Sequence, residues 1–192
     1  MYKKIIFVFL LITAACNFQG QTLKNRQPDP KWSIRMANTI LTRSDSLIYY
    51  VDRNPKWAYD VAFLGMAIDR LGNIDIKYSK YMENWVNYFV RPDGSVVNYK
   101  IAEYNLDRIF PGRNVITVYK RNHDPKYKIT LDNFIEQLKT HPKTNSGGYW
   151  HKKIYSWQMW LDGIFWHQPI WLSMQKSLIH LNGLMLPVCR QK

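Results

Sequence analysis

The chain has 192 residues, of which 46% are hydrophobic and 15% aromatic, so the composition excludes an intrinsically disordered protein and predicts one domain with a hydrophobic core. Its 27 Lys and Arg residues outnumber 14 Asp and Glu, and the formal net charge of +13 favours anionic partners. The basic residues are dispersed, however, and no nucleic-acid-binding motif of recognised spacing occurs, so nucleic acid is not an expected partner.

The segment 1–15 is predicted to be an export signal. A short basic start, Tyr2-Lys3-Lys4, precedes an apolar run from Ile5 to Ile12 that is too short to span a bilayer. Cys16 follows two alanines, as in a bacterial lipoprotein box, and would either carry a lipid or follow a signal that is simply removed. The expected location is therefore the periplasm, or a membrane tether through that lipid alone. The polar segment 16–30 is expected to be a linker, with the folded part beginning near Lys31.

Apolar residues that recur at three- and four-residue steps predict helices along the rest of the chain. One stripe runs from Met36 to Ile48 and a second from Trp57 to Leu71, where Gly72 ends it. A third stripe, rich in aromatic residues, runs from Tyr78 to Phe89. Val96–Tyr99 is expected to be a short extended piece at most.

Two prolines mark the next predicted helices. Pro111 lies near the start of a helix over Asn114–Lys120, and Asp124-Pro125 is typical of an N-cap followed by proline at the first helical position. The segment 140–148 is expected to be a loop, and a final helix to begin near Trp157 or Gln158. Successive helices of this kind predict an all-α array. The helix after Pro125 is expected to bury Leu131, Phe134, Ile135 and Leu138.

The stretch 147–163 concentrates the candidate chemistry. Its Gly147-Gly148 pair lets the backbone turn where a Cβ would obstruct it, and the stretch holds three of the eight tryptophans. Asp162 is the only acidic residue after Glu136. If buried among aromatic rings, its carboxyl group would be poorly solvated and would keep a proton, as a general acid requires. A helix cap, or an ion pair with a nearby lysine, is the alternative that residue type alone favours.

Blocks of sequence between about Lys31 and Phe165 resemble a known family. The most specific blocks are GGYWHK at 147–152 and QMWLDG at 158–163. The others are WAYDV at 57–61, YNLD at 104–107, DPKY at 124–127, and QL at 137–138 with HPKT at 141–144. In this order the blocks resemble the unsaturated rhamnogalacturonyl hydrolases of glycoside hydrolase family 105 and, more distantly, the unsaturated glucuronyl hydrolases of family 88.

The resemblance implies an all-α (α/α)6 toroid, of which this chain would form about half. The implied substrate is a rhamnogalacturonan oligosaccharide with a 4,5-unsaturated galacturonyl sugar at its non-reducing end. A carboxylic acid protonates C4 of the double bond, water adds at C5, and the hemiketal opens and releases the neighbouring sugar. By position, Asp162 matches the general acid/base and Asp107 the second carboxylate, while Tyr59, His151 and Trp160 match substrate contacts. Neither a metal nor another cofactor is implied, and no His, Cys, Asp or Glu cluster has ligand spacing.

From the residues alone, each of these positions has a structural alternative. Asp107 could cap a helix, and His151 could be a polar residue with satisfied hydrogen bonds. Tyr59 and Trp160 could be core aromatics. Two carboxylates placed close together would instead share a proton, which supplies an acid near neutral pH.

The chain departs from the family pattern in length and in its last residues. Its six or so predicted helices make half a toroid, and the family pattern stops after Phe165. We therefore expect 31–165 to be the N-terminal half of the hydrolase domain and 166–192 to be an off-pattern tail produced by a frameshift, which reading the downstream DNA in the other two frames would test. Because half a toroid exposes apolar faces, little or no hydrolase activity is expected of the polypeptide as written.

Two other classes of function stay open. One is a non-catalytic saccharide-binding lipoprotein, which would bind the unsaturated oligosaccharide without consuming it, or an inactive truncated remnant. A basic surface protein would bind anionic polymers through charge alone, with an affinity that falls steeply with salt and ignores sugar identity. The oligomeric state has no signal in the sequence.

Overall fold

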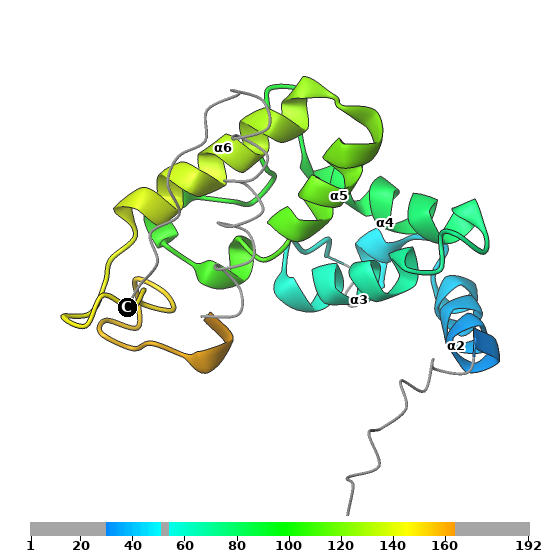
Figure 1. The fold of residues 1–192 in the computed structure, drawn as a ribbon, viewed down its shortest axis with the longest axis horizontal. Helices are drawn as coiled ribbons and strands as arrows, with labels where there is room; N and C mark the ends of the chain where they lie inside the picture. Colours follow the sequence, from blue (N-terminus) through cyan, green and yellow to red (C-terminus); the bar gives the residue numbers. More distant parts are fainter. Residues whose placement is uncertain (1–29, 51–53, 164–192) are drawn as a thin grey trace, which may run out of the picture. The chain divides into compact units, whose positions relative to one another are not determined.

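The computed structural model describes residues 30–50 and 54–163 (Figure 1). Over these residues helices predominate and the only β-structure is two isolated bridges, so the prediction of an all-α protein is confirmed. None of the helices in this described part is long and apolar enough to cross a membrane. The predicted export signal, the linker up to residue 29, Cys16 and the tail after residue 163 lie outside the described residues.

The chain divides into two compact units, residues 1–38 and 39–192. The described part of the first unit is the beginning of α2, where the Arg35 guanidinium lies 4.5 Å from the centre of the Trp32 ring. The named elements are, in chain order, α2 (Pro30–Arg43), η1 (Leu47–Tyr49), α3 (Tyr59–Asp69), α4 (Ile76–Phe89), η2 (Ile101–Glu103), η3 (Leu106–Arg108), α5 (Gly112–Asn122) and α6 (Pro125–Thr140).

Capping residues explain where the helices begin. The Asp75 carboxylate accepts the Lys77 amide at the start of α4, and the Asp124 carboxylate accepts the Lys126 amide at the start of α6. Each carboxylate satisfies an amide that has no partner inside the helix. Pro125 occupies the first turn of α6, so the predicted Asp124-Pro125 start is confirmed. The helix predicted after Pro111 is also confirmed, as α5.

Some predicted boundaries differ from the structure. The stripe from Met36 to Ile48 is interrupted, because α2 ends at Arg43 and Ser46 starts the separate turn η1 by accepting the Ile48 amide. Trp57 is buried, but it precedes α3 in a segment without regular secondary structure. The last described helix begins at residue 161, because turns occupy 153–157 and Trp157 has a left-handed φ of 64°.

The core of the second unit is built from aromatic rings. Trp57 and Trp85 stack with ring centres 4.9 Å apart and planes 9° apart, and Phe89 and Phe134 lie against Trp57. All four side chains are fully buried. Each aromatic pair contributes about 0.5–1.5 kcal/mol beyond the burial of its surface. This cluster therefore holds the segment before α3 against α4 and α6.

Hydrogen bonds from buried side chains join further elements. Asn114 of α5 donates its side-chain amide to the Ala62 carbonyl of α3. On α6, Leu131, Phe134 and Leu138 are buried as predicted, whereas Ile135 is only partly buried. Helix α6 thus presents one buried face to the core, and its C-terminal end at Thr140 leads into the loop that carries the candidate chemistry.

Candidate active site

Asp107 lies in the short turn η3 and is oriented by the residue two positions before it. Asn105 is the N-cap of this turn, and its side-chain oxygen accepts the Asp107 amide at 3.0 Å. The capping role that residue type allowed for Asp107 is therefore taken by Asn105. The Asp107 carboxylate is left to face the loop that follows α6.

The Gly147-Gly148 pair shapes that loop. Gly147 has a φ of +87°, which side chains rarely adopt, and a Cβ on Gly148 would collide with the sulfur of Met159. The Thr144 amide donates to the Gly148 carbonyl at 2.8 Å, and the Trp150 amide donates to the Pro142 carbonyl. The pair is glycine because the loop turns back on itself and packs against Met159.

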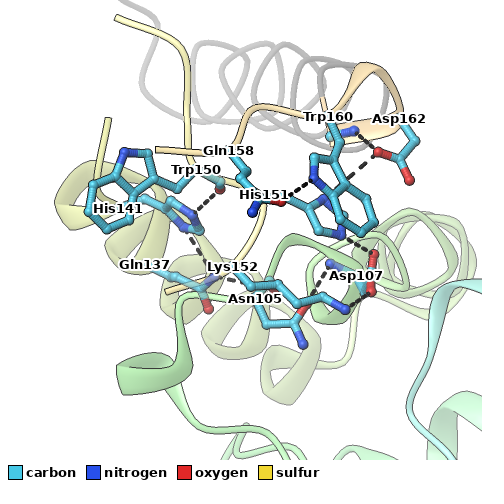
Figure 2. Close-up of polar contacts among 11 residues, drawn as sticks. Asn105, Asp107, Gln137, His141, Trp150, His151, Lys152, Gln158, Trp160 and Asp162 are labelled. Carbon is cyan, nitrogen blue, oxygen red and sulfur yellow. Dashed lines mark hydrogen bonds and ion pairs between the residues drawn. The ribbon is translucent and has the colours of Figure 1, made fainter. Parts of the chain in front are cut away.

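His151 connects the two segments that carry the carboxylates. Its backbone amide donates to the Gln158 carbonyl at 2.7 Å, and its carbonyl accepts the Leu106 amide at 3.1 Å. Its imidazole is buried, with Nε2 3.4 Å from Asp107 Oδ1 and Nδ1 3.8 Å from Asp162 Oδ1 (Figure 2). One imidazole thus has a carboxylate at each nitrogen.

Burial makes the neutral form of His151 the dominant one at neutral pH. Loss of hydration lowers the pKa of His151 below its ordinary 6.5; the charges of Asp107 and Asp162 oppose this shift, and Lys152 adds to it. A neutral imidazole has one N–H donor and one acceptor nitrogen. Within the described part of the chain, Nδ1 has no hydrogen-bond partner. The N–H therefore belongs on Nε2, toward Asp107, and Nδ1 faces Asp162 as an acceptor.

Trp160 covers this imidazole. The two rings are parallel within 7°, with centres 4.1 Å apart, and the Tyr155 ring stacks on Trp160 at 5.5 Å. The Trp160 indole N–H donates to the side chain of Gln158, which fixes the ring. The Trp160 side chain is 41% exposed, so it is not a core aromatic.

Asp162 lies in the helix that begins at residue 161, with its Oδ1 3.8 Å from His151 Nδ1. Its Oδ1 accepts the Gly163 amide at 2.7 Å. The side chain is 45% exposed, so the condition under which its carboxyl group would be poorly solvated, burial among aromatic rings, is not met in the described structure. The position is accessible to a ligand from solvent, whereas Asp107 is 15% exposed.

Tyr59 is placed on a different element from the other predicted site residues. It is the first residue of α3, and its ring is 41% exposed, so the core alternative does not hold for it either. Two residues earlier, Trp57 donates its indole N–H to the Arg108 carbonyl, and the Arg108 guanidinium donates to the Trp57 carbonyl. This reciprocal pair joins the segment before Tyr59 to the residue after Asp107.

Lys152 was not predicted as a site residue. Its Nζ lies 2.7 Å from Asp107 Oδ2, and its side chain is only 21% exposed. Its place in the GGYWHK block, directly after His151, was the available signal. An open cleft of about 390 Å³ lies beside this ion pair, lined by Ala102, Glu103, Asn105, Lys152, Lys153 and Ile154. That volume falls in the range of about 300–1,000 Å³ typical of ligand sites.

The cluster also has a donor set that metals use. One ligand atom from each of Asp107, His151 and Asp162 can be chosen so that all lie within 4.8 Å of one another. The spacing along the chain shows no such cluster and predicted no metal; the fold brings the three residues together. The carboxylates approach opposite nitrogens of one ring, however, whereas a single ion takes one nitrogen of an imidazole. The arrangement places one imidazole between two carboxylates.

Comparisons with known proteins bear on this geometry. A model of the family described as Glycosyl Hydrolase Family 88 matches residues 32–180. A solved structure of a family 105 glycoside hydrolase from C. acetobutylicum ATCC 824 is similar to 80% of this chain, with 29% sequence identity and a TM-score of 0.65. This chain spans 41% of the length of that protein, and the predicted fold class, about half of an (α/α)6 toroid, is confirmed. The family match extends past Phe165, where the family pattern was expected to end.

Proposed function

The chain belongs to Glycosyl Hydrolase Family 88, and we propose that its site removes 4,5-unsaturated galacturonyl sugars from the non-reducing ends of rhamnogalacturonan oligosaccharides. The observation that supports this proposal is the placement of Asp107 and Asp162 on opposite nitrogens of one buried imidazole, with the Trp160 ring stacked over it. Family 105, to which the solved relative belongs, is the family that the sequence blocks resemble most.

Asp162 is assigned the proton transfers because it is the accessible carboxyl group of the pair. Its carboxylic acid donates a proton to C4 of the substrate, and the cation that forms at C5 is shared with the ring oxygen. The carboxylate then accepts a proton from the water that adds at C5. The resulting hemiketal opens and releases the neighbouring sugar, so the net reaction consumes one water molecule and restores the acid.

Asp107 is assigned a charge-stabilising role because it is held more firmly. Lys152 at 2.7 Å and the imidazole at 3.4 Å fix its two oxygens. A preorganised anion of this kind stabilises positive charge that develops on the sugar ring in the transition state. Trp160 is assigned the contact to the sugar. The His151 imidazole is buried under the Trp160 ring, so its assigned role is to lie between the two carboxylates rather than to touch the sugar. The partly exposed Tyr59 is also proposed as a contact.

Loss of the double-bond absorbance tests the proposal. Unsaturated rhamnogalacturonan disaccharide is mixed with an excess of the protein, so that slow turnover is detected within a single round of reaction. Because little activity is expected of half a toroid, the absorbance is expected to fall slowly with the wild-type chain and to persist with Asp162→Asn. Asp132→Asn, which removes an exposed carboxylate on α6, is the matched control and is expected to behave as wild type. Absorbance that persists with the wild-type chain would contradict the proposed chemistry, and binding without turnover would favour the non-catalytic alternative.

The salt dependence of binding distinguishes the proposed site from a protein that binds anionic polymers through charge alone. Saccharide binding through stacking and hydrogen bonds is expected to change little between low and moderate ionic strength, whereas charge-driven binding falls steeply. Measuring the binding of a saturated disaccharide under the same conditions tests whether the double bond is recognised.

A further inference from the structure

The sequence block formed by Gln137, Leu138 and His141–Thr144 has no role in the proposed chemistry. Gln137 lies in the last turn of α6, and its side chain is fully buried. His141 is the C-cap residue of the same helix and is 3% exposed. A buried amide and a buried imidazole one helical turn apart need hydrogen-bond partners, and the identity of these partners indicates what the block does.

The hydrogen bonds of Gln137 determine its orientation. Its Nε2 lies 3.4 Å from the Asn105 carbonyl oxygen and 3.4 Å from His141 Nδ1, and its Oε1 accepts the Tyr99 hydroxyl at 2.5 Å. A carbonyl oxygen only accepts, so the NH2 group of Gln137 must face Asn105. Both of its N–H groups then have acceptors, and its oxygen has a donor.

The same reasoning determines the tautomer of His141. Because the amide of Gln137 donates, His141 Nδ1 must accept and carries no proton. His141 Nε2 lies 2.7 Å from the Trp150 carbonyl oxygen, which also only accepts, so Nε2 carries the proton. His141 is therefore a neutral imidazole that accepts a hydrogen bond from Gln137 and donates one to the Trp150 carbonyl (Figure 2).

The two ends of this chain of hydrogen bonds are neighbours of the candidate site. Asn105 is the residue whose side chain caps the turn that carries Asp107, and Trp150 precedes His151. We propose that Gln137 and His141 are positioning residues, which set the distance between the Asp107 turn and the His151 loop through the backbone carbonyls of Asn105 and Trp150. This inference rests on the proposed function for its effect on rate, but the geometry it describes does not.

The geometry explains why polar residues occupy these buried positions. Apolar side chains could fill the same volume, but they would leave the Asn105 and Trp150 carbonyls without these side-chain donors. A hydrogen bond also has a narrower range of distance and angle than an apolar contact. The end of α6 therefore acts as a rigid spacer, because both segments are bonded to side chains of one helical turn.

Three variants test the inference. His141→Leu removes both hydrogen bonds of the imidazole, whereas His141→Gln supplies an oxygen for Gln137 and an NH2 group for the Trp150 carbonyl. Thr130→Val is the matched control, since Thr130 is a fully buried residue of the same helix that donates to the Gly94 and Lys126 carbonyls, away from the site. Each variant is compared with the wild-type chain.

The first readout is hydrogen exchange of the Leu106 amide, which bonds to the His151 carbonyl and so reports whether the two segments stay together. Exchange of this amide is expected to accelerate in His141→Leu, to recover in His141→Gln and to stay unchanged in Thr130→Val. The second readout is single-turnover hydrolysis. His141→Leu is expected to lower the rate constant roughly 10- to 100-fold with little change in substrate affinity, because misplacing catalytic groups by about 1 Å costs on this order.

The two measurements can contradict the positioning role and the proposed function independently. Unchanged Leu106 exchange in His141→Leu, or equal acceleration in His141→Leu and Thr130→Val, would overturn the positioning role whether or not the chain is active. Faster exchange together with an unchanged rate constant would also overturn it. If the wild-type chain shows no turnover, the proposed function fails, and the exchange of Leu106 in the three variants still decides whether Gln137 and His141 hold the two segments in register.

Discussion

Replacing Lys152 with methionine is expected to destabilise the fold and to raise the pKa of His151. Lys152 Nζ lies 2.7 Å from Asp107 Oδ2, and both side chains are largely buried. At that distance Coulomb's law gives an attraction of about 6 kcal/mol for an effective dielectric constant of about 20, and about 1.5 kcal/mol in water. Desolvation of the two charges cancels most of this attraction. We therefore expect the free energy of unfolding to fall by about 1–3 kcal/mol.

The titration of His151 reports the same ion pair independently. Burial is the main cause of its lowered pKa; the Asp107 carboxylate raises that pKa, and the Lys152 ammonium lowers it. Lys152→Met should therefore raise the pKa of His151, and Asp107→Asn should lower it further. General loosening of the loop would admit water and raise the pKa in both variants, so opposite directions identify a charge effect.

Urea unfolding and an NMR titration of the imidazole measure the two effects. Lys153→Met is the matched control, because it removes the same charge from the next residue, an exposed lysine whose Nζ lies 5.9 Å from the centre of the Tyr104 ring. Its unfolding free energy is expected to stay within about 0.5 kcal/mol of wild type. Equal losses in the two lysine variants, or a pKa of His151 that does not rise in Lys152→Met, would refute the reasoning.

Two further predictions concern His151 and Trp160. Because the pKa of His151 is lowered from 6.5 in the folded chain, the unfolded chain binds more protons between the two pKa values. The stability of the folded chain should therefore decline as the pH falls below 6.5. The melting temperature measured against pH should show this decline in wild type and a smaller one in His151→Gln. An identical dependence of melting temperature on pH in His151→Gln would show that His151 is not the group responsible. Trp160→Ala should weaken binding of the unsaturated disaccharide by about 1 kcal/mol, measured by calorimetry, whereas Trp157→Ala, an exposed ring on the same loop, should not.

The sequence predicted a helix boundary well where the residues that set the boundary lie within the first turn of the helix. Asp124 and Pro125 act within the first turn of α6, so the residues themselves mark its start. The stripe from Met36 to Ile48 misled, because Ser46 makes a local hydrogen bond that periodicity does not register. The last helix was placed too early for a similar reason, since the left-handed Trp157 interrupts a stretch rich in aromatic residues.

The candidate site was predicted from blocks of sequence rather than from chemistry. Asp107, His151, Trp160 and Asp162 do lie together, although their types alone favoured structural roles. The Lys152–Asp107 pair could not be predicted, because it depends on the Leu106–His151 backbone bond that brings two distant segments together. The sequence left the burial of Asp162 open, because an isolated carboxylate among aromatic residues in sequence is not thereby surrounded by them in space.

The proposed chemistry requires Asp162 and Asp107 to act on the double bond of an unsaturated uronyl sugar held at Trp160. The measurement that tests it most directly is a crystal structure of Asp162→Asn with the unsaturated rhamnogalacturonan disaccharide. We expect C4 of the terminal sugar at about 3–3.5 Å from the side chain of residue 162, with the ring in contact with Trp160 and Asp107. A sugar bound elsewhere, or one that turns C4 away from residue 162, would contradict it.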